Sequence, residues 1–153
     1  MQDCFGIKGS VCFEHRKADG TLVSRQENHN LVTNAGWDWL YNQMSGTVDD
    51  VANYIALTAD AGPASAEHTT LASEYVDFGL ERAVATPAHT PSAKTYTLTK
   101  VFTCDTDTKL VSMAGLFNAA AVGIMVLETV LTSPTTLMDT DTLTVTWTIT
   151  MGT

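Results

Sequence analysis

The strongest pattern in the chain is a strict alternation of apolar residues and threonines near its C-terminal end. Every even-numbered position from 142 to 150 is threonine, and the odd-numbered positions hold Leu143, Val145, Trp147, Ile149 and Met151. Because successive side chains of a strand point to opposite faces, this pattern predicts a strand with one buried face and one solvent-facing face. A slip of one residue would expose the whole apolar face, so we expect a fixed register. The core residues expected from this strand are Leu143, Val145, Trp147 and Ile149.

A second pattern has helical spacing and predicts one α-helix at about residues 34–45. Four side chains recur at i, i+3, i+4 and i+7 and therefore share one helical face: Trp37, Leu40, Tyr41 and Met44. Asn34 is the expected N-cap, and Gly46 can end the helix. We expect this helix to pack on a sheet, with three of its side chains in the core: Trp37, Leu40 and Met44.

The rest of the chain predicts short strands separated by turns. Residues 11–15 and 21–25 flank an Asp19-Gly20 pair that is typical of a β-hairpin. Further strands are expected at residues 53–58, 82–86, 95–103, 110–117 and 124–131. The last two form a predicted hairpin, and its second strand is almost entirely apolar, so we expect it to be central or covered on both faces. Pro87 and Pro91 predict a loop before Lys94.

These elements predict a mainly β fold. Seven or eight short strands, one helix and no βα rhythm indicate an antiparallel two-sheet sandwich of jelly-roll-like type. The length of 153 residues suits one domain. We expect residues 11–153 to form a single β-sandwich domain, and residues 1–10, which contain two glycines, to form a flexible N-terminal arm.

Composition supports the sheet and argues against some partners. The chain has 25 threonines, a β-branched residue that suits strands, and only 16% charged residues. Its net charge is −9, from 8 Lys and Arg against 17 Asp and Glu. Because phosphate backbones require clustered cations, we expect no nucleic-acid partner. The acids look scattered along the chain, which indicates a solubilising field.

The cysteines and the N-terminal sequence indicate a protein made in a cytosol. Cys4, Cys12 and Cys104 are odd in number and lack a CxxC spacing, so reduced thiols are expected. Residues 1–10 lack the cationic and apolar regions of a signal peptide, and no apolar run approaches about 18 residues. We therefore expect neither signal-directed secretion nor a membrane partner.

Motifs of catalysis are missing from the sequence. It contains no GxSxG, no GxxxxGK followed by Ser or Thr, and no HExxH. The four histidines lack ligand spacing and are expected at the surface or in turns: His15, His29, His68 and His89. We expect a protein without enzymatic activity and without a cofactor.

Two Asp-x-Asp pairs are the remaining candidates for chemistry. Asp105 with Asp107, and Asp139 with Asp141, both lie at the ends of predicted strands. Such pairs can chelate a hard cation such as calcium when further oxygens converge. Aspartate also caps turns, and neither pair continues into the Gly and distal Glu of an EF-hand loop. Turn capping is therefore the favoured interpretation, and a metal site is the alternative.

Five blocks, in order over about residues 7–151, resemble a family of small virion proteins of tailed bacteriophages. The blocks are HNLVTNAG (29–36), NYIAL (53–57), TLASE (70–74), AGLFNA (114–119) and DTLTVTWTIT (141–150). Members of the family are decoration, minor capsid or tail-associated proteins, and no catalytic residues come with it. The chain departs from the family pattern at residues 58–60, where a more Gly-rich turn is expected.

The resemblance implies a virion component that is made in the host bacterial cytoplasm. Our first hypothesis is a capsid decoration or cement protein, a homo-oligomer with a trimer favoured, that contacts the major capsid protein or other virion proteins. The alternative is a tail, neck or fibre-base protein, including an adhesion module for host glycans. Trp39 lies off the helical stripe, and with Tyr41 it is the expected interface aromatic.

Overall fold

The computed structural model describes residues 6–152. Within them the chain forms ten strands and one α-helix. In chain order the elements are β1 (Ile7–Arg16), β2 (Leu22–His29), β3 (Leu31–Val32), α1 (Asn34–Met44), β4 (Tyr54–Thr58), β5 (Ala83–Val84), β6 (Thr86–His89), β7 (Thr95–Thr103), β8 (Thr108–Phe117), β9 (Met125–Met138) and β10 (Thr142–Met151).

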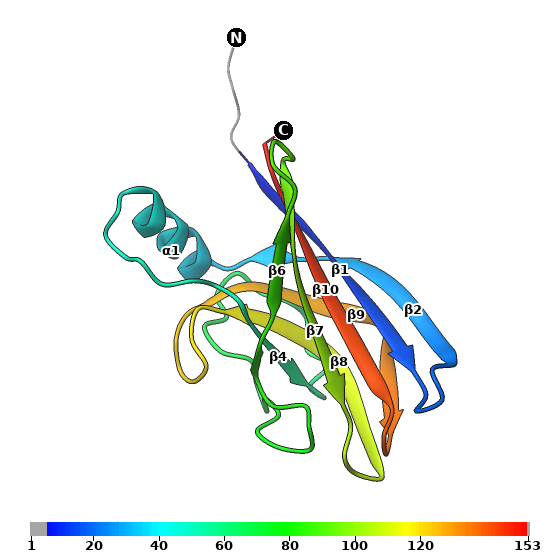
Figure 1. The fold of residues 1–153 in the computed structure, drawn as a ribbon. Coiled ribbons are helices and arrows are strands. Elements are labelled where there is room, and N and C mark those ends of the chain that lie inside the picture. The colour runs from blue at the N-terminus through cyan, green and yellow to red at the C-terminus, as the bar shows by residue number, and fades with distance from the viewer. Residues whose placement is uncertain (1–5, 153) are drawn as a thin grey trace.

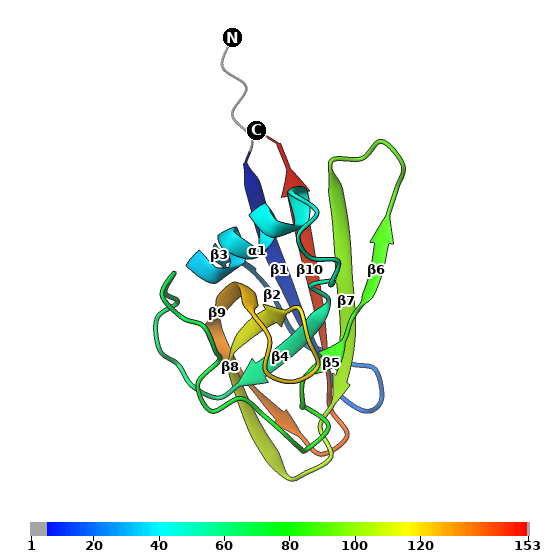
Figure 2. The ribbon, with the colours of Figure 1, turned by 90° about the vertical axis from the view of Figure 1, so that its left-hand side faces the viewer.

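The strands build two antiparallel sheets of five strands each. The first sheet has the order β2-β1-β10-β7-β6 and the second has the order β3-β9-β8-β4-β5. The two sheets pack face to face around the main core, so the predicted β-sandwich is confirmed (Figures 1 and 2). Hairpins join β1 to β2, β6 to β7 and β8 to β9. The connections β2–β3, β5–β6, β7–β8 and β9–β10 pass between the sheets, whereas α1 links β3 to β4 and a long connection links β4 to β5 within the second sheet.

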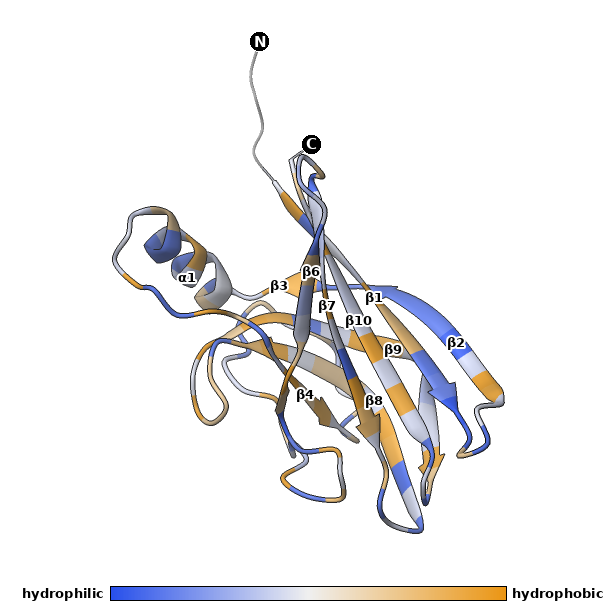
Figure 3. Ribbon diagram, viewed as in Figure 1, coloured by the Kyte–Doolittle hydropathy of each residue, from blue (hydrophilic) through white to orange (hydrophobic). Residues whose placement is uncertain are grey.

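Strand β10 lies in the middle of the first sheet, between β1 and β7. Its predicted core side chains are all buried: Leu143, Val145, Trp147 and Ile149. The alternation is visible as bands of hydrophobic and near-neutral residues along β10 in Figure 3. At ~1.5–3 kcal/mol for each large apolar side chain, these four contribute about 6–12 kcal/mol of gross transfer free energy before chain entropy is subtracted. The fifth apolar residue, Met151, is exposed at the end of the strand.

The N-terminal strand begins earlier than predicted. Residues 7–10 were expected in a flexible arm, but they extend β1, where Ile7 pairs with Met151 and Ser10 with Thr148. The prediction is wrong here because glycine at position 9 leaves room for the side chain of Asn30, which a Cβ at that position would meet at 1.8 Å. Residues 1–5 of the predicted arm lie outside the described residues. The hairpin at Asp19-Gly20 is confirmed.

Side-chain amides of β2 tie the edge of the first sheet to the second sheet. Strand β9 bulges away from β8 between the pairs Met113–Val130 and Val111–Thr135, which frees backbone groups of β9. The Asn28 carboxamide oxygen accepts from the Thr132 N–H at 3.1 Å, and the Gln26 carboxamide bonds both the N–H and the carbonyl of Ser133. The side chains of Gln26 and Asn28 therefore satisfy backbone groups of β9 and link β2 to the second sheet.

The outer face of the second sheet is covered by the long connection between β4 and β5. Buried Leu71 of this connection packs with Met113, Phe117 and Met125 in a small second core. Arg82 anchors its end, because the guanidinium makes a bidentate pair with Glu74 and stacks on Phe117 at 3.6 Å. Strands β8 and β9 are thus covered on both faces, as the apolar run at 124–131 predicted.

The loop predicted around Pro87 is instead an edge strand. Residues Thr86–His89 form β6, in which Pro87 lies opposite Leu98 of β7. Proline is tolerated on an edge strand because the N–H that it lacks can be one that has no ladder partner. It also protects this edge from pairing with another chain.

Candidate functional site

Helix α1 covers the gap between the two sheets at the end where β1 begins and β10 ends (Figure 2). Thr33, rather than the predicted Asn34, is the N-cap, and its hydroxyl accepts from the Gly36 N–H at 2.9 Å. The same hydroxyl donates to the carbonyl of Met125 on β9. Gly36 lies against β9 so closely that a Cβ would be 2.2 Å from the Val126 carbonyl oxygen. These two residues set how the helix is rotated about its axis.

That rotation reverses the prediction for two core residues of the helix. Trp37 is 45% exposed and Met44 is 71% exposed, so neither belongs to the core, and Leu40 is only half-buried. The prediction was wrong because the side without bulky residues, at Gly36, approaches β9 most closely. The helix then turns Trp37, Tyr41 and Met44 to solvent.

Trp39 also differs from the prediction, which placed it at an interface. It is partly buried and packs against the main core. Its indole N–H donates to the Asp50 carboxylate at 2.7 Å, and the Gln43 amide donates to the same oxygen at 2.9 Å. Trp39 therefore positions α1 on the sandwich. Tyr41, the other predicted interface residue, is 70% exposed.

A small apolar cavity, the α1 groove, lies beneath the helix. It has a volume of about 180 Å³, and residues of both sheets and of α1 line it. Trp39 and Leu40 form its helical wall, and Ile7, Leu116 and Ile149 are among its sheet residues. The groove lies between the docked side of α1 and the two sheets. Because its lining is almost entirely apolar, it offers few polar groups to a ligand.

The opposite side of α1 carries an exposed apolar stripe, the α1 patch, which consists of Trp37, Tyr41 and Met44. The spacing of i, i+4 and i+7 places the three side chains in one row along the helix. Single exposed apolar residues are ordinary, but a contiguous row of large ones marks an interaction surface. Tryptophan and tyrosine are also the residues most enriched among energetic hot spots of protein interfaces.

The charges of the chain are strongly segregated. Residues 26–81 contain nine of the seventeen acids and none of the eight Lys and Arg, whereas the remaining residues carry eight acids and eight bases. The net charge of −9 therefore belongs to a segment that builds α1 and the covering connection of the second sheet. The acids are spread along the chain, as expected, but Lys and Arg are absent from this segment, and a count of cations along the sequence would have found this signal.

Four of these acids, the acidic rim, lie on α1 or near its ends: Asp38, Asp49, Asp50 and Glu67. Asp38 lies one turn from Tyr41 on the exposed side of the helix. The Glu67 carboxylate accepts from the Asn34 amide at 2.8 Å, and Asp50 accepts from the neutral donors of Trp39, Gln43 and Asn118. Among residues 6–152, no Lys, Arg or His pairs with any rim carboxylate.

The outer face of the first sheet is a threonine surface. Thr146 lies opposite Thr99 and Thr148 opposite Thr97 across the β10–β7 pair, and all four are half-buried. The β10 side of this face is polar, as the alternation of β10 predicted, and charged side chains such as Glu14, Arg25 and Glu27 lie beside it on β1 and β2.

The structure places one histidine in a buried contact with a carboxylate. His15 was expected at the surface, but it is 5% exposed, and its Nε2 lies 2.8 Å from an Asp141 carboxylate oxygen. Burial opposes ionisation of Asp141, yet hydrogen bonds from the Met138 N–H and from His15, together with the His15 charge, hold the pKa of this carboxyl below its ordinary value. Asp141 thus caps the β9–β10 turn, which is the favoured interpretation of the sequence.

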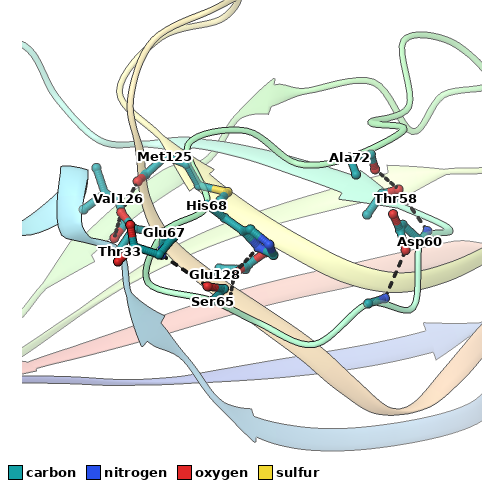
Figure 4. Close-up of polar contacts among 11 residues, drawn as sticks. Thr33, Thr58, Asp60, Ser65, Glu67, His68, Ala72, Met125, Val126 and Glu128 are labelled. Atoms are coloured by element: carbon teal, nitrogen blue, oxygen red, sulfur yellow. Dashed lines mark hydrogen bonds and ion pairs between the residues drawn. The ribbon is translucent and has the colours of Figure 1, made fainter.

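A second buried carboxylate, Glu128, was missed at the sequence level. It is 1% exposed and lies on the outer face of β9, where it accepts from the Ser65 N–H at 3.0 Å and contacts His68 Nδ1 at 2.9 Å (Figure 4). These contacts attach the β4–β5 connection to the sheet. A single charged residue inside the apolar run at 124–131 was the available signal, since a buried charge requires partners. His29 and His89 are exposed, as predicted.

The two Asp-x-Asp pairs lie in neighbouring turns but do not form one site. The Cys104 N–H donates to the Asp141 carbonyl and the Thr140 N–H to the Cys104 carbonyl, which joins the two turns. Asp105, Asp107 and Asp139 are exposed, while Asp141 is committed to His15. Across residues 6–152 no group of three or more His, Cys, Asp or Glu side chains is arranged to hold a metal ion.

Comparison of the chain with protein-family models, with curated proteins and with solved structures finds no match. In the described part of the chain no helix is long and apolar enough to cross a membrane. Cys12 and Cys104 are free thiols. The geometry of the α1 end is therefore the main evidence about function.

Proposed function

We propose that the chain is a structural component of a bacteriophage virion, and specifically a capsid decoration protein that binds the shell through its α1 end. Two observations support the proposal. One is the resemblance over residues 7–151 to small virion proteins, and the other is the α1 patch. The patch carries the proposal, because it is a row of large apolar side chains that the fold itself leaves uncovered.

The patch suits repeated docking on a particle. Burying apolar surface stabilises a contact by roughly 25 cal/mol for each Å² removed from water, so three large side chains supply a useful but modest affinity. A decoration protein that is also a symmetric oligomer, with a trimer as our first choice, engages several shell subunits at once, and linked weak contacts give a tight attachment. The proposal assigns no reaction and no cofactor to the chain. Its partner is the major capsid protein, and its location is the virion after synthesis in the bacterial cytoplasm.

Copy number on purified particles tests this proposal. Quantitative mass spectrometry of virions from a phage that encodes the chain should find hundreds of copies, because a decoration protein follows the shell lattice. A count of about six to twelve copies would instead place the protein at the neck or tail. Absence from the particle would contradict a virion role altogether.

A second candidate is a tail or fibre-base adhesion module for host glycans. The observation that favours it is the pairing of two exposed aromatic rings, Trp37 and Tyr41, at i and i+4 on α1. Such rings can stack on sugar faces. Under this hypothesis Trp37→Ala and Tyr41→Ala each abolish binding of the purified protein to host cells, while Trp39→Phe leaves binding intact. Unchanged cell binding by both alanine variants would dismiss the adhesion role.

A further inference from the structure

The α1 patch and the acidic rim lie together at the α1 end of the molecule. The three apolar side chains of the patch are exposed on α1, and Asp38 and Glu67 lie beside the first turns of the helix. Asp49 and Asp50 follow its last turn in the chain, with Asp50 bound on the Trp39 side. Interfaces of this kind place apolar anchors at the centre and charges at the edge. The rim carboxylates receive hydrogen bonds only from neutral groups among residues 6–152, so their charges are oriented but not neutralised.

From this we infer that α1 docks as a helical ligand into an apolar groove rimmed by Lys and Arg on a partner protein. Charge complementarity favours a partner with this cationic rim. A cationic rim gains from the negative field of residues 26–81, both in the rate of encounter and in the choice of partner. The helix-in-groove mode uses i, i+4 and i+7 anchors, which is the spacing of Trp37, Tyr41 and Met44.

The negative charge of residues 26–81 argues against three other partners: a second copy of the chain, a nucleic acid and an anionic lipid surface. A second copy docked through the same face would bring two acidic rims together, since a two-fold interface presents the same patch from both subunits. Nucleic acids and anionic lipid surfaces carry the same sign of charge as the rim and are repelled. Any homo-oligomer of this chain therefore uses another surface. Lys8 and Lys94 stand at the same end of the molecule, but they belong to the first sheet, and their backbones pair with β10.

A synthetic peptide tests the surface chemistry without an identified partner. The probe is an amphipathic helix of Lys and Leu, compared with Ser/Leu and Glu/Leu helices of the same length, each titrated into the isotopically labelled full chain. We expect NMR shifts confined to α1 and the rim for the Lys peptide, and binding that weakens roughly tenfold between 50 and 500 mM NaCl. The Tyr41→Ala, Met44→Ala double variant should weaken binding about tenfold or more.

Matched variants separate apolar anchoring from charge. Asp38→Asn with Asp49→Asn should weaken binding severalfold and reduce its salt dependence. The control is Val101→Ala with Met138→Ala, which removes two side chains that are about half exposed on other faces and should not change binding. Equal binding of all three peptides, shifts away from α1, or a control variant as defective as the α1 variants would each overturn the inference. So would dimerisation of the chain that the Tyr41→Ala, Met44→Ala variant abolishes in sedimentation experiments.

Because the partner is a capsid protein only if the proposed function holds, a second measurement separates the two claims. Purified chain is added back to particles produced without it. Salt-sensitive rebinding that is lost in the α1 variants supports both claims. If the α1 variants still rebind, the virion role is supported and the α1 interface is refuted. If the chain binds the peptide but does not rebind to particles, the interface is supported and the decoration role is refuted.

Discussion

The close contact of α1 with β9 makes Gly36→Ala an informative substitution. In an unconstrained helix, alanine in place of glycine stabilises by about 1 kcal/mol. Here the new Cβ would lie 2.2 Å from the Val126 carbonyl oxygen and 2.9 Å from its Cα, and both are backbone atoms that no side-chain rotation can move. The helix must therefore lift by about 1 Å. Overpacking of this kind costs ~1–3 kcal/mol, and loss of the Thr33 hydroxyl bond to β9 adds about 1 kcal/mol.

We expect a net loss of about 2 kcal/mol, opposite in sign to the helix-propensity effect, and a melting temperature lower by about 4–8 °C. Urea denaturation followed by circular dichroism measures it. The control is Asn42→Ala in the same helix, where the side chain has no hydrogen bond to any of residues 6–152 and the propensity gain should appear as a small stabilisation. If Gly36→Ala is as stable as the parent or more so, the close approach at Gly36 does not determine which face of α1 is buried.

Three further predictions concern stability. Asp141→Asn should lower the free energy of unfolding by about 2 kcal/mol at pH 7, because the bond to His15 is lost. Folding lowers the pKa of Asp141, so the stabilisation by this carboxylate is present above its unfolded pKa and is lost as the pH falls through its folded pKa. The difference from wild type in urea titrations should thus shrink between pH 7 and pH 3, and a constant difference would refute the assignment. Truncation after residue 140 should abolish folding, since β10 is the central strand of the first sheet, and a soluble truncation with a cooperative melt would contradict this. Arg82→Lys should cost about 1–3 kcal/mol, because lysine cannot reproduce the bidentate pair with Glu74 and the stacking on Phe117, and a thermal melt unchanged from wild type would show that neither contact matters.

Local patterns were sufficient to predict most of the strands. The alternation at 142–151 predicted both β10 and its buried face, because a strand's period of two leaves only two possible assignments and only one of them buries the apolar residues. The Asp-Gly turn likewise predicted the first hairpin. The cation-free segment 26–81 was also readable in the sequence, since charge does not depend on the fold.

The buried face of α1 could not be predicted in the same way. Its inner residues, such as Gly36 and Trp39, and its outer residues, such as Trp37 and Met44, are both compatible with a helix that packs on a sheet. Hydrophobic periodicity favoured the outer set because four large side chains recur at helical spacing from Trp37 to Met44. The deciding interaction was the close approach of Gly36 to Val126 on β9. These residues are 90 positions apart in the chain, so no local pattern contains that contact.

The sequence by itself therefore determined the fold class, the core face of β10 and the location of the net charge. These depend on side-chain alternation and on residue type, which are properties of short segments. The tertiary structure alone decided that His15 meets Asp141, that Glu128 holds the β4–β5 connection through His68, and that α1 turns its apolar patch to solvent. Each of these arrangements joins segments that are 60 or more residues apart, so it exists only when packing of the two sheets has brought them into contact.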